Sequence, residues 1–98
     1  MTINETKNGS ELIISLEGRL DTMTAPELEE ELKKVLPETE QLTFDFEGLE
    51  YISSAGLRVL LSAQKVMSKQ GSMKITHANE TIMEIFEVTG FVDILTIE

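Results

Sequence analysis

The chain has 98 residues, 41% of them hydrophobic, which is enough for one folded domain with its own apolar core. It carries 18 acidic and eight basic residues, so the basic surface that nucleic acids and anionic membranes require is missing. The net charge of −10 favours solubility and fits a basic protein partner. With no cysteine and one histidine, the chain offers no disulfide and no multi-histidine metal site, and we expect neither a metal nor a cofactor.

Nothing in the sequence divides the chain or directs it to a membrane. No apolar run approaches the ~20 residues that span a bilayer. The first residues lack the basic and apolar segments of a secretory signal. We therefore expect a single cytoplasmic domain over residues 1–98, with no membrane partner.

The N-terminal part of the sequence predicts a β-hairpin. Residues 2–8 form a weak strand candidate, and Asn8 and Gly9 provide the turn signal that joins two antiparallel strands. Apolar residues alternate through 11–17, which predicts a second strand with one covered face. Gly18 is expected to end this strand.

The first predicted helix covers residues 25–36. Thr24 and Glu27 have the spacing of a capping box, in which the threonine hydroxyl accepts from a backbone amide and the glutamate reaches back. Pro26 suits the first turn, where its missing N–H costs nothing. Leucine and valine recur on one face, and Pro37 is expected to stop the helix.

The middle of the chain pairs the clearest strand with the longest helix. Alternation over 41–47 predicts the strand, which Gly48 is expected to break. A broad apolar stripe from 55 to 69 predicts a helix packed closely on a sheet, with Gly71 as its C-terminal stop.

A strand and a helix complete the pattern. Residues 72–77 alternate as a short strand, and Asn79 is expected to cap a third helix that ends at Gly90. Residues 94–97 fit either a short final strand or a strand-like tail. The order β-β-α-β-α-β-α predicts an α/β fold: a small mixed sheet of four to five strands with helices mainly on one face. The hairpin is expected to be antiparallel, and the third and fourth strands parallel.

The residues that catalysis requires are not gathered in the sequence. A serine nucleophile needs a base within reach, but the only histidine, His77, falls at a predicted strand end, and no Gly-x-Ser-x-Gly turn occurs. Phosphate-loop motifs are absent as well. Among the carboxylates, Asp21 lies in a loop near the strand ends where α/β sheets bind ligands, whereas Asp45 and Glu47 fit the solvated side of a strand. We expect no enzyme activity and no catalytic residue.

Two adjacent serines, Ser53 and Ser54, stand where the third predicted strand gives way to the second helix. One interpretation makes a serine the helix cap, with Ala55 and Gly56 packing closely against the sheet. The other makes one serine a phosphorylation switch, because a helix N-terminus tolerates a phosphate that a partner surface would reject. The residue types alone favour capping.

Three segments resemble motifs of the STAS domain, the fold of bacterial anti-sigma-factor antagonists. Residues 51–60, Tyr-Ile-Ser-Ser-Ala-Gly-Leu-Arg-Val-Leu, resemble the signature of this family. Gly-Arg-Leu-Asp at 18–21, with Thr-Ala at 24–25, is similar to its upstream motif, and Thr-Gly-Phe at 89–91 to a third element. The resemblance covers nearly the whole chain.

This resemblance implies a binding switch. In such proteins the unphosphorylated antagonist binds an anti-sigma-factor serine kinase and frees the sigma factor. Phosphorylation releases the antagonist, and a serine phosphatase restores it. Alignment on the Gly-Leu pair places the phosphoacceptor on Ser54; Ser53, which stands where many antagonists have Asp, is the alternative. The implied partner-binding surface comprises Asp21, Thr24, Ser53, Ser54, Gly56 and Arg58.

Two alternatives to this function stay open. STAS domains also serve partner switches that control no sigma factor, and they occur as the tails of transporters. The same fold could also form a sensory module for a small, nucleotide-like ligand, which would need a concave pocket beside Asp21.

Overall fold

A single mixed sheet organises the molecule, and the computed structural model describes all 98 residues. The strand order is β1-β2-β3-β4, with β1 antiparallel to β2 and the other neighbours parallel. The strands are β1 (Thr2–Asn8), β2 (Glu11–Leu20), β3 (Gln41–Ile52) and β4 (Ser72–Thr76). The predicted α/β class, the antiparallel hairpin and the parallel pairing of the third and fourth strands are confirmed.

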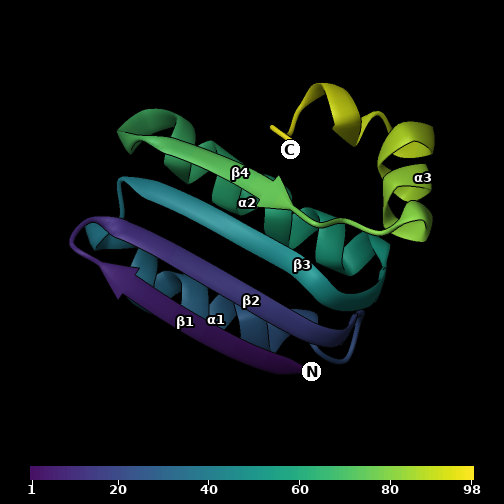
Figure 1. Cartoon of the computed structure of the whole chain (residues 1–98), viewed down its shortest axis with the longest axis horizontal. Coiled ribbons are helices and arrows are strands. Elements are labelled where there is room, and N and C mark those ends of the chain that lie inside the picture. Colours follow the sequence, from purple (N-terminus) through teal and green to yellow (C-terminus); the bar gives the residue numbers. More distant parts are fainter.

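Three helices cover one face and one end of this sheet (Figure 1). They are α1 (Ala25–Val35), α2 (Ser54–Gln70) and α3 (Glu80–Thr89), with short 3₁₀ turns η1 (Leu36–Glu38) and η2 (Phe91–Asp93). The helices α1 and α2 lie behind the sheet, whereas α3 lies beside the end where β3 and β4 finish (Figure 1). None of the helices is both long and apolar enough to cross a membrane.

The core lies between the sheet and the two helices behind it. Alternate residues of β2 and β3 point into it and are buried, as their hydrophobic alternation predicts. They are Leu12, Ile14, Leu16, Leu42, Phe44 and Phe46. The opposite face of the sheet carries half-buried residues such as Ser15, Thr43 and Thr76 and is covered by no helix. This one-sided burial explains why the strands alternate instead of being apolar throughout.

Two glycines that were expected to end strands lie inside them instead. The strand β2 continues past Gly18 to Leu20, and β3 continues past Gly48 to Ile52. Register shifts mark this region of the β2–β3 pair, where Gly48 pairs with Glu17 and Gly18 has φ +101°. The prediction was wrong because glycine here permits bulges, at which the pairing is irregular but continues.

The other boundaries agree with the sequence to within a residue or two. The helix α1 ends at Val35, and Pro37 follows it in η1, where the first 3₁₀ turn needs no amide at that position. The amide of Ile82 donates to the side chain of Asn79 at 2.8 Å, and Gly90 has left-handed angles, so the predicted start and stop of α3 are confirmed. The strand-like tail is confirmed as one parallel bridge, between Ile75 and Ile97.

Candidate functional site

The ends of β2 and β3 lie side by side and bring two loops together. Leu20 pairs with Ile52, and the amide of Ser53 donates to the carbonyl of Leu20 at 2.9 Å. The loop that begins at Asp21 therefore adjoins the start of α2, at one end of the sheet. This placement agrees with the expectation from the sequence that Asp21 and the double serine share one end.

The two serines differ in what their hydroxyl groups contact. Ser53 is half-buried and extended, and its Oγ accepts a long hydrogen bond of 3.4 Å from the amide of Gly56. Ser53 is therefore the helix cap. Ser54 is the first residue of α2; it is exposed, and its hydroxyl has no hydrogen-bond partner in the protein. A free hydroxyl thus lies at the positive end of a helix of 17 residues.

Gly56 is buried and allows α2 to approach the strand ends. A Cβ atom on this residue would lie 2.7 Å from Cγ of Leu20 and 2.8 Å from Cγ1 of Ile52. Contacts this short occur for no ordinary side chain, so only glycine fits without displacing its neighbours. Gly56 therefore affects the shape of the expected partner-binding surface, although almost none of its atoms is exposed there.

Arg58 is the first charged residue of α2 and lies one turn after Ser54. Residues four apart in a helix share a face, so the guanidinium and the Ser54 hydroxyl project from the same side. Arg58 is exposed and forms no ion pair. It therefore remains available to an anionic group at the helix start or on a partner.

Asp21 and Thr24 are bonded to their own loop. Oδ1 of Asp21 accepts from the amides of Met23 and Thr24 at 3.0 and 3.2 Å. Oγ1 of Thr24 accepts from the amide of Asp21 at 2.9 Å and donates to the carbonyl of Arg19 at 2.8 Å. The predicted capping box is wrong: Thr24 has helical angles and no side-chain cap bond, because its hydroxyl satisfies backbone groups left at the end of β2.

The charge on Asp21 is stabilised by this loop. Removal from water acts to raise the pKa of its carboxyl, but the amides of Thr24 and Met23, the Thr24 hydroxyl and the positive charge of Arg19 together outweigh it. The pKa of Asp21 therefore lies below its ordinary value. The Nε atom of Arg19 is 3.8 Å from Oδ2 of the carboxylate, so the ion pair is loose.

An arginine–tyrosine stack at this end of the sheet was missed in the sequence. The guanidinium of Arg19 lies 4.5 Å from the ring centroid of Tyr51, within the range of a cation–π contact. Arg19 and Tyr51 are cross-strand partners only because of the shifts in the β2–β3 register. A regular register would have offset them, so the sequence alone carried no signal for this contact.

His77 belongs to another part of the sheet. Its Nδ1 lies 3.0 Å from Oδ1 of Asp45, on the face that no helix covers, so its partner is this carboxylate and neither serine. With Glu47, the two residues offer ligand atoms within 4.8 Å of one another. His77 and Glu47 are exposed, and nothing else in this group points to a bound ion.

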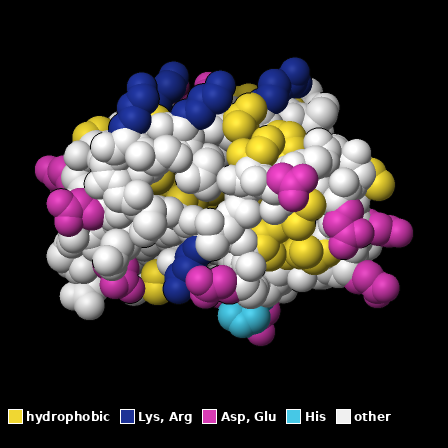
Figure 2. Space-filling view, turned by 90° about the horizontal axis from the view of Figure 1, so that it is seen from above, with side chains coloured by type: hydrophobic (Ala, Val, Ile, Leu, Met, Phe, Trp, Pro, Cys, Tyr) yellow, Lys and Arg dark blue, Asp and Glu magenta, His cyan; other side chains and the backbone are white.

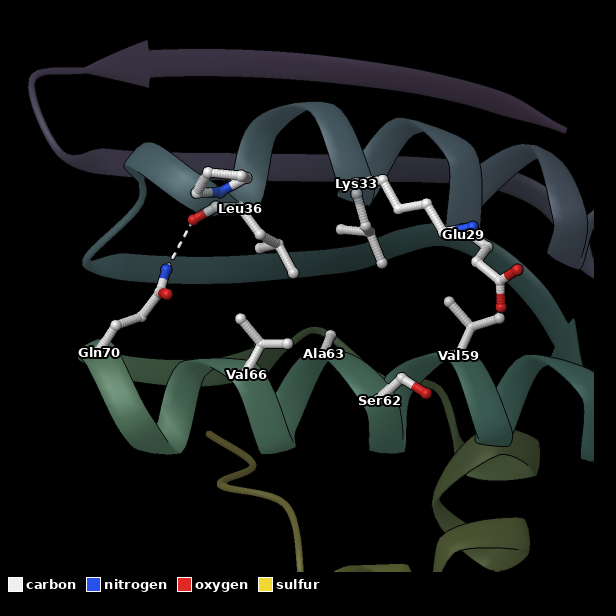
Figure 3. Close-up of a pocket in the computed structure, with 10 residues that line it drawn as sticks. Glu29, Lys33, Leu36, Val59, Ser62, Ala63, Val66 and Gln70 are labelled. Atoms are coloured by element: carbon white, nitrogen blue, oxygen red, sulfur yellow. Dashed lines mark hydrogen bonds between the residues drawn. The ribbon is translucent and has the colours of Figure 1, made fainter.

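The largest groove lies between α1 and α2 (Figure 3). Its volume is about 740 Å³, and Leu32, Leu36, Val59, Ala63 and Val66 supply its apolar lining. Asp21 is not among the residues that line it. A small-ligand module was expected to have a concave pocket beside Asp21. The groove between α1 and α2 is not at that place.

Comparison with known proteins places this arrangement in one class of domain. The family model described as "Mlab, STAS domain" matches residues 3–96. The chain belongs to the STAS domain family, as its motifs indicated, and this is the family in which anti-sigma-factor antagonists are found.

Two relatives are similar over most of their length. The chain is 28% identical over 98 residues to the anti-sigma-B factor antagonist of Bacillus subtilis, covering 99% of this chain and 90% of the relative. It is 36% identical over 88 residues to the protein named "Putative anti-sigma factor antagonist BtrV" of Bordetella bronchiseptica, covering 88% of this chain and 76% of BtrV.

Solved structures share the fold at lower sequence identity. An anti-sigma factor antagonist from Mycobacterium paratuberculosis aligns with a TM-score of 0.88 at 21% identity, covering 98% of this chain and 83% of that one. The antagonist SpoIIAA aligns in its unphosphorylated form with a TM-score of 0.78 at 14% identity, covering 99% and 87%. Its phosphorylated form, from Bacillus, aligns at 0.77 and 15% identity, covering 99% and 91%.

Proposed function

We propose that this chain is an anti-sigma-factor antagonist that acts by phosphorylation-controlled partner switching, with Ser54 as the phosphoacceptor. In this proposal the unphosphorylated chain binds an anti-sigma-factor serine kinase and frees the sigma factor. Phosphorylation releases the chain, and a serine phosphatase restores it. The chain acts by binding and not by catalysis. The observation that carries the proposal is the exposed, unbonded hydroxyl of Ser54 at the N-terminus of α2.

The contacts of the two serines support Ser54 over Ser53. The hydroxyl of Ser53 caps α2, and its half-buried position leaves less room for a kinase to reach it. Phosphorylating Ser53 would also alter the hydroxyl that caps α2. Ser54 contributes no such bond, so its hydroxyl is free to be modified without loss of a native contact.

The start of α2 is suited to a phosphate without a change of fold. A phosphoserine adds about −1.5 to −2 charges and three acceptor oxygens. The first amides of α2 and the helix dipole favour that charge. Arg58, one turn away on the same face, offers a guanidinium for pairing. The two forms of SpoIIAA align with this chain to nearly the same extent, which is consistent with a fold that persists through such a change.

The adjoining loop completes the proposed partner-binding surface. Asp21 and Thr24 hold the loop after β2 in a fixed shape, and Gly56 brings α2 against it. Ser53, Ser54 and Arg58 lie on the helix side of the same surface. A partner that fits this surface meets an uncharged hydroxyl at Ser54 before phosphorylation and a dianion afterwards.

Phosphorylation by a purified anti-sigma-factor serine kinase from the host tests the proposal. We expect intact-mass measurement to show one added phosphate on wild type and on Ser53→Ala, and none on Ser54→Ala. Ser54→Ala should still bind the kinase, whereas Ser54→Asp should bind it more weakly. Incorporation into Ser54→Ala at the wild-type rate would exclude Ser54 as the acceptor, and unchanged affinity of Ser54→Asp would exclude the charge mechanism.

A further inference from the structure

The helix α2 has a charge pattern opposite to that of the chain. Its 17 residues include three basic residues and no acidic one, although the chain as a whole has a net charge of −10. The three residues are Arg58, Lys65 and Lys69; all are exposed, and none forms an ion pair. Their spacing of i, i+7 and i+11 places them on one face of the helix. We call these three residues the basic ridge.

The basic ridge stands out against the rest of the surface. Most of the Lys and Arg side chains visible in Figure 2 lie along one edge of the molecule, whereas the single histidine lies at the opposite edge with a basic side chain near it. Lys69 follows Arg58 by eleven positions, so the ridge extends along about 17 Å of helix. Acidic side chains are absent from α2, so within this helix nothing neutralises the ridge.

The apolar groove between α1 and α2 runs beside the basic ridge. Ser62 and Val66 line the groove. Helical spacing places both residues on the side of α2 that adjoins the basic ridge. Val66 is 40% exposed, so the groove presents apolar surface to solvent. Figure 3 shows Leu36, Val66 and Ala63 between the two helices, with Gln70 bonded across one end.

We propose that the basic ridge and this groove together bind one amphipathic helix of a protein partner, whose apolar side chains enter the groove and whose acidic side chains face the ridge. An amphipathic helix in a hydrophobic groove is a common mode of recognition, and complementary charge fixes its register. The ridge length of about 17 Å matches three turns of such a helix. This inference rests on the proposed function and names the chemistry that the partner must offer.

Extended polyanions fit this surface less well than a protein segment does. Outside α2 the chain has a large excess of acidic residues, which repels a membrane surface or a nucleic-acid duplex. Screening limits each charge to about 8 Å at physiological ionic strength. A narrow acidic segment lying along α2 therefore meets the basic ridge without meeting the acidic remainder.

The position of Ser54 couples this surface to the proposed switch. Ser54 precedes Arg58 by one turn on the same face of α2. A phosphate there places about two negative charges at the end of the basic ridge. It would pair with Arg58 and repel the acidic side chains of the partner. The affinity of an acidic segment is therefore expected to fall on phosphorylation.

Titration of the whole protein, labelled with ¹⁵N, tests the inference without the kinase. The probe is a synthetic helical peptide of about 18 residues, or five turns, with Leu on one face and Glu beside it. We expect amide shifts to concentrate in residues 29–37 and 58–70 and the affinity to fall as NaCl is raised. Lys65→Glu with Lys69→Glu should weaken binding at least tenfold, or about 1.4 kcal/mol.

The control is Lys7→Glu with Lys74→Glu, which makes the same change of charge on β1 and β4. It should change the affinity less than about threefold, because neither lysine lines the groove or belongs to α2. Circular dichroism confirms that each variant is folded. Equal losses in the two double variants would overturn the inference, as would no saturable shift, shifts centred on the sheet, or tighter binding to phosphatidylglycerol vesicles than to the peptide.

Failure of the inference and failure of the proposed function give different results. If the host kinase phosphorylates Ser54 and binds the Lys65→Glu, Lys69→Glu variant as tightly as wild type, the basic ridge is excluded while the switch stands. If wild type takes up no phosphate, the proposed function fails, and the peptide titration still decides whether the ridge binds an acidic helix.

Discussion

The helices α1 and α2 begin in the same way in the sequence and differently in the structure. Each follows a parallel strand, and each has a hydroxyl residue at its start, Thr24 for α1 and Ser53 for α2. The Thr24 hydroxyl turns away from its helix to the carbonyl of Arg19 and the amide of Asp21. The Ser53 hydroxyl turns toward its helix and accepts from Gly56.

This difference separates a structural turn from a candidate switch. At the start of α1 the polar side chains are used within the loop, and the carboxylate of Asp21 takes part in it. At the start of α2 a single cap suffices, and the next hydroxyl, that of Ser54, has no partner. A hydroxyl without a native role is one that a kinase is able to modify at little cost to stability.

The largest expected effect comes from filling the space at Gly56. Gly56→Val places side-chain carbons within about 3 Å of Leu20 and Ile52, and the strain should lower the free energy of unfolding by about 3 kcal/mol. Urea denaturation measures it, with Ser62→Val, at an exposed position of the same helix, as the control. Equal losses in the two variants would show that α2 does not depend on this close approach.

Removing the hydroxyl of Thr24 should cost less, because the groups it leaves unpaired are partly open to water. Thr24→Val deletes the bonds to the carbonyl of Arg19 and the amide of Asp21, and we expect a loss of about 1–2 kcal/mol. The matched control is Thr22→Val, since Thr22 is exposed and has no side-chain bond. A loss no greater than that of the control would mean that the loop does not need this hydroxyl.

The two serines allow the stability effect of a capping hydroxyl to be compared directly with that of a free one. Ser53→Ala removes the cap of α2 and should cost about 0.5–1 kcal/mol, at the low end because the bond is long at 3.4 Å. Ser54→Ala should change stability by less than about 0.5 kcal/mol. Chemical denaturation at neutral pH measures both. If Ser54→Ala were the more destabilising change, the assignment of cap and free hydroxyl would be reversed.

The smallest effect is a dependence on pH at Asp21. Because the pKa of Asp21 is lowered by folding, its charge stabilises the native state above the unfolded pKa of about 3.9, and this is lost as the pH falls through the native pKa. Asp21→Asn does not titrate. The stability advantage of wild type over this variant should therefore shrink in acid. Denaturation at about pH 6 and about pH 3 compares them; an advantage that grows in acid would contradict the lowered pKa.

Local signals in the sequence predicted much of the fold. Hydrophobic alternation identified the buried faces of β2 and β3, and the Asn8–Gly9 pair identified the hairpin turn. Asn79 and Gly71 marked the ends of helices correctly, because capping depends on residues a few positions away. Gly18 and Gly48 were misjudged, since a glycine in a bulge and a glycine that ends a strand look alike until the neighbouring strand is known.

The candidate site, like the fold, could be predicted from the sequence only in part. The double serine and the loop at Asp21 could be located from the sequence, since both follow strands that pair. The role of Thr24 could not, because it depends on a carbonyl left free where β2 ends. The basic ridge could not be recognised from the net charge, because a total of −10 suggested a basic partner. Helical spacing within α2 nevertheless places Arg58, Lys65 and Lys69 on one face.

The side chain of Gln70 holds the C-terminal end of α2 in place, which affects how a partner could detect phosphorylation. Its Nε2 donates to the carbonyls of Leu36 and Thr39 at 2.6 and 2.7 Å, which fastens the last turn of α2 to the segment after α1. The other end of α2 is fastened to β2 through Ser53 and Leu20. Because α2 is held by hydrogen bonds at both ends, we expect it to keep its position when a phosphate is attached to its first residue. A partner would therefore sense a new charge at a fixed place, and the phosphorylated chain should superpose on the unmodified one along the whole of α2.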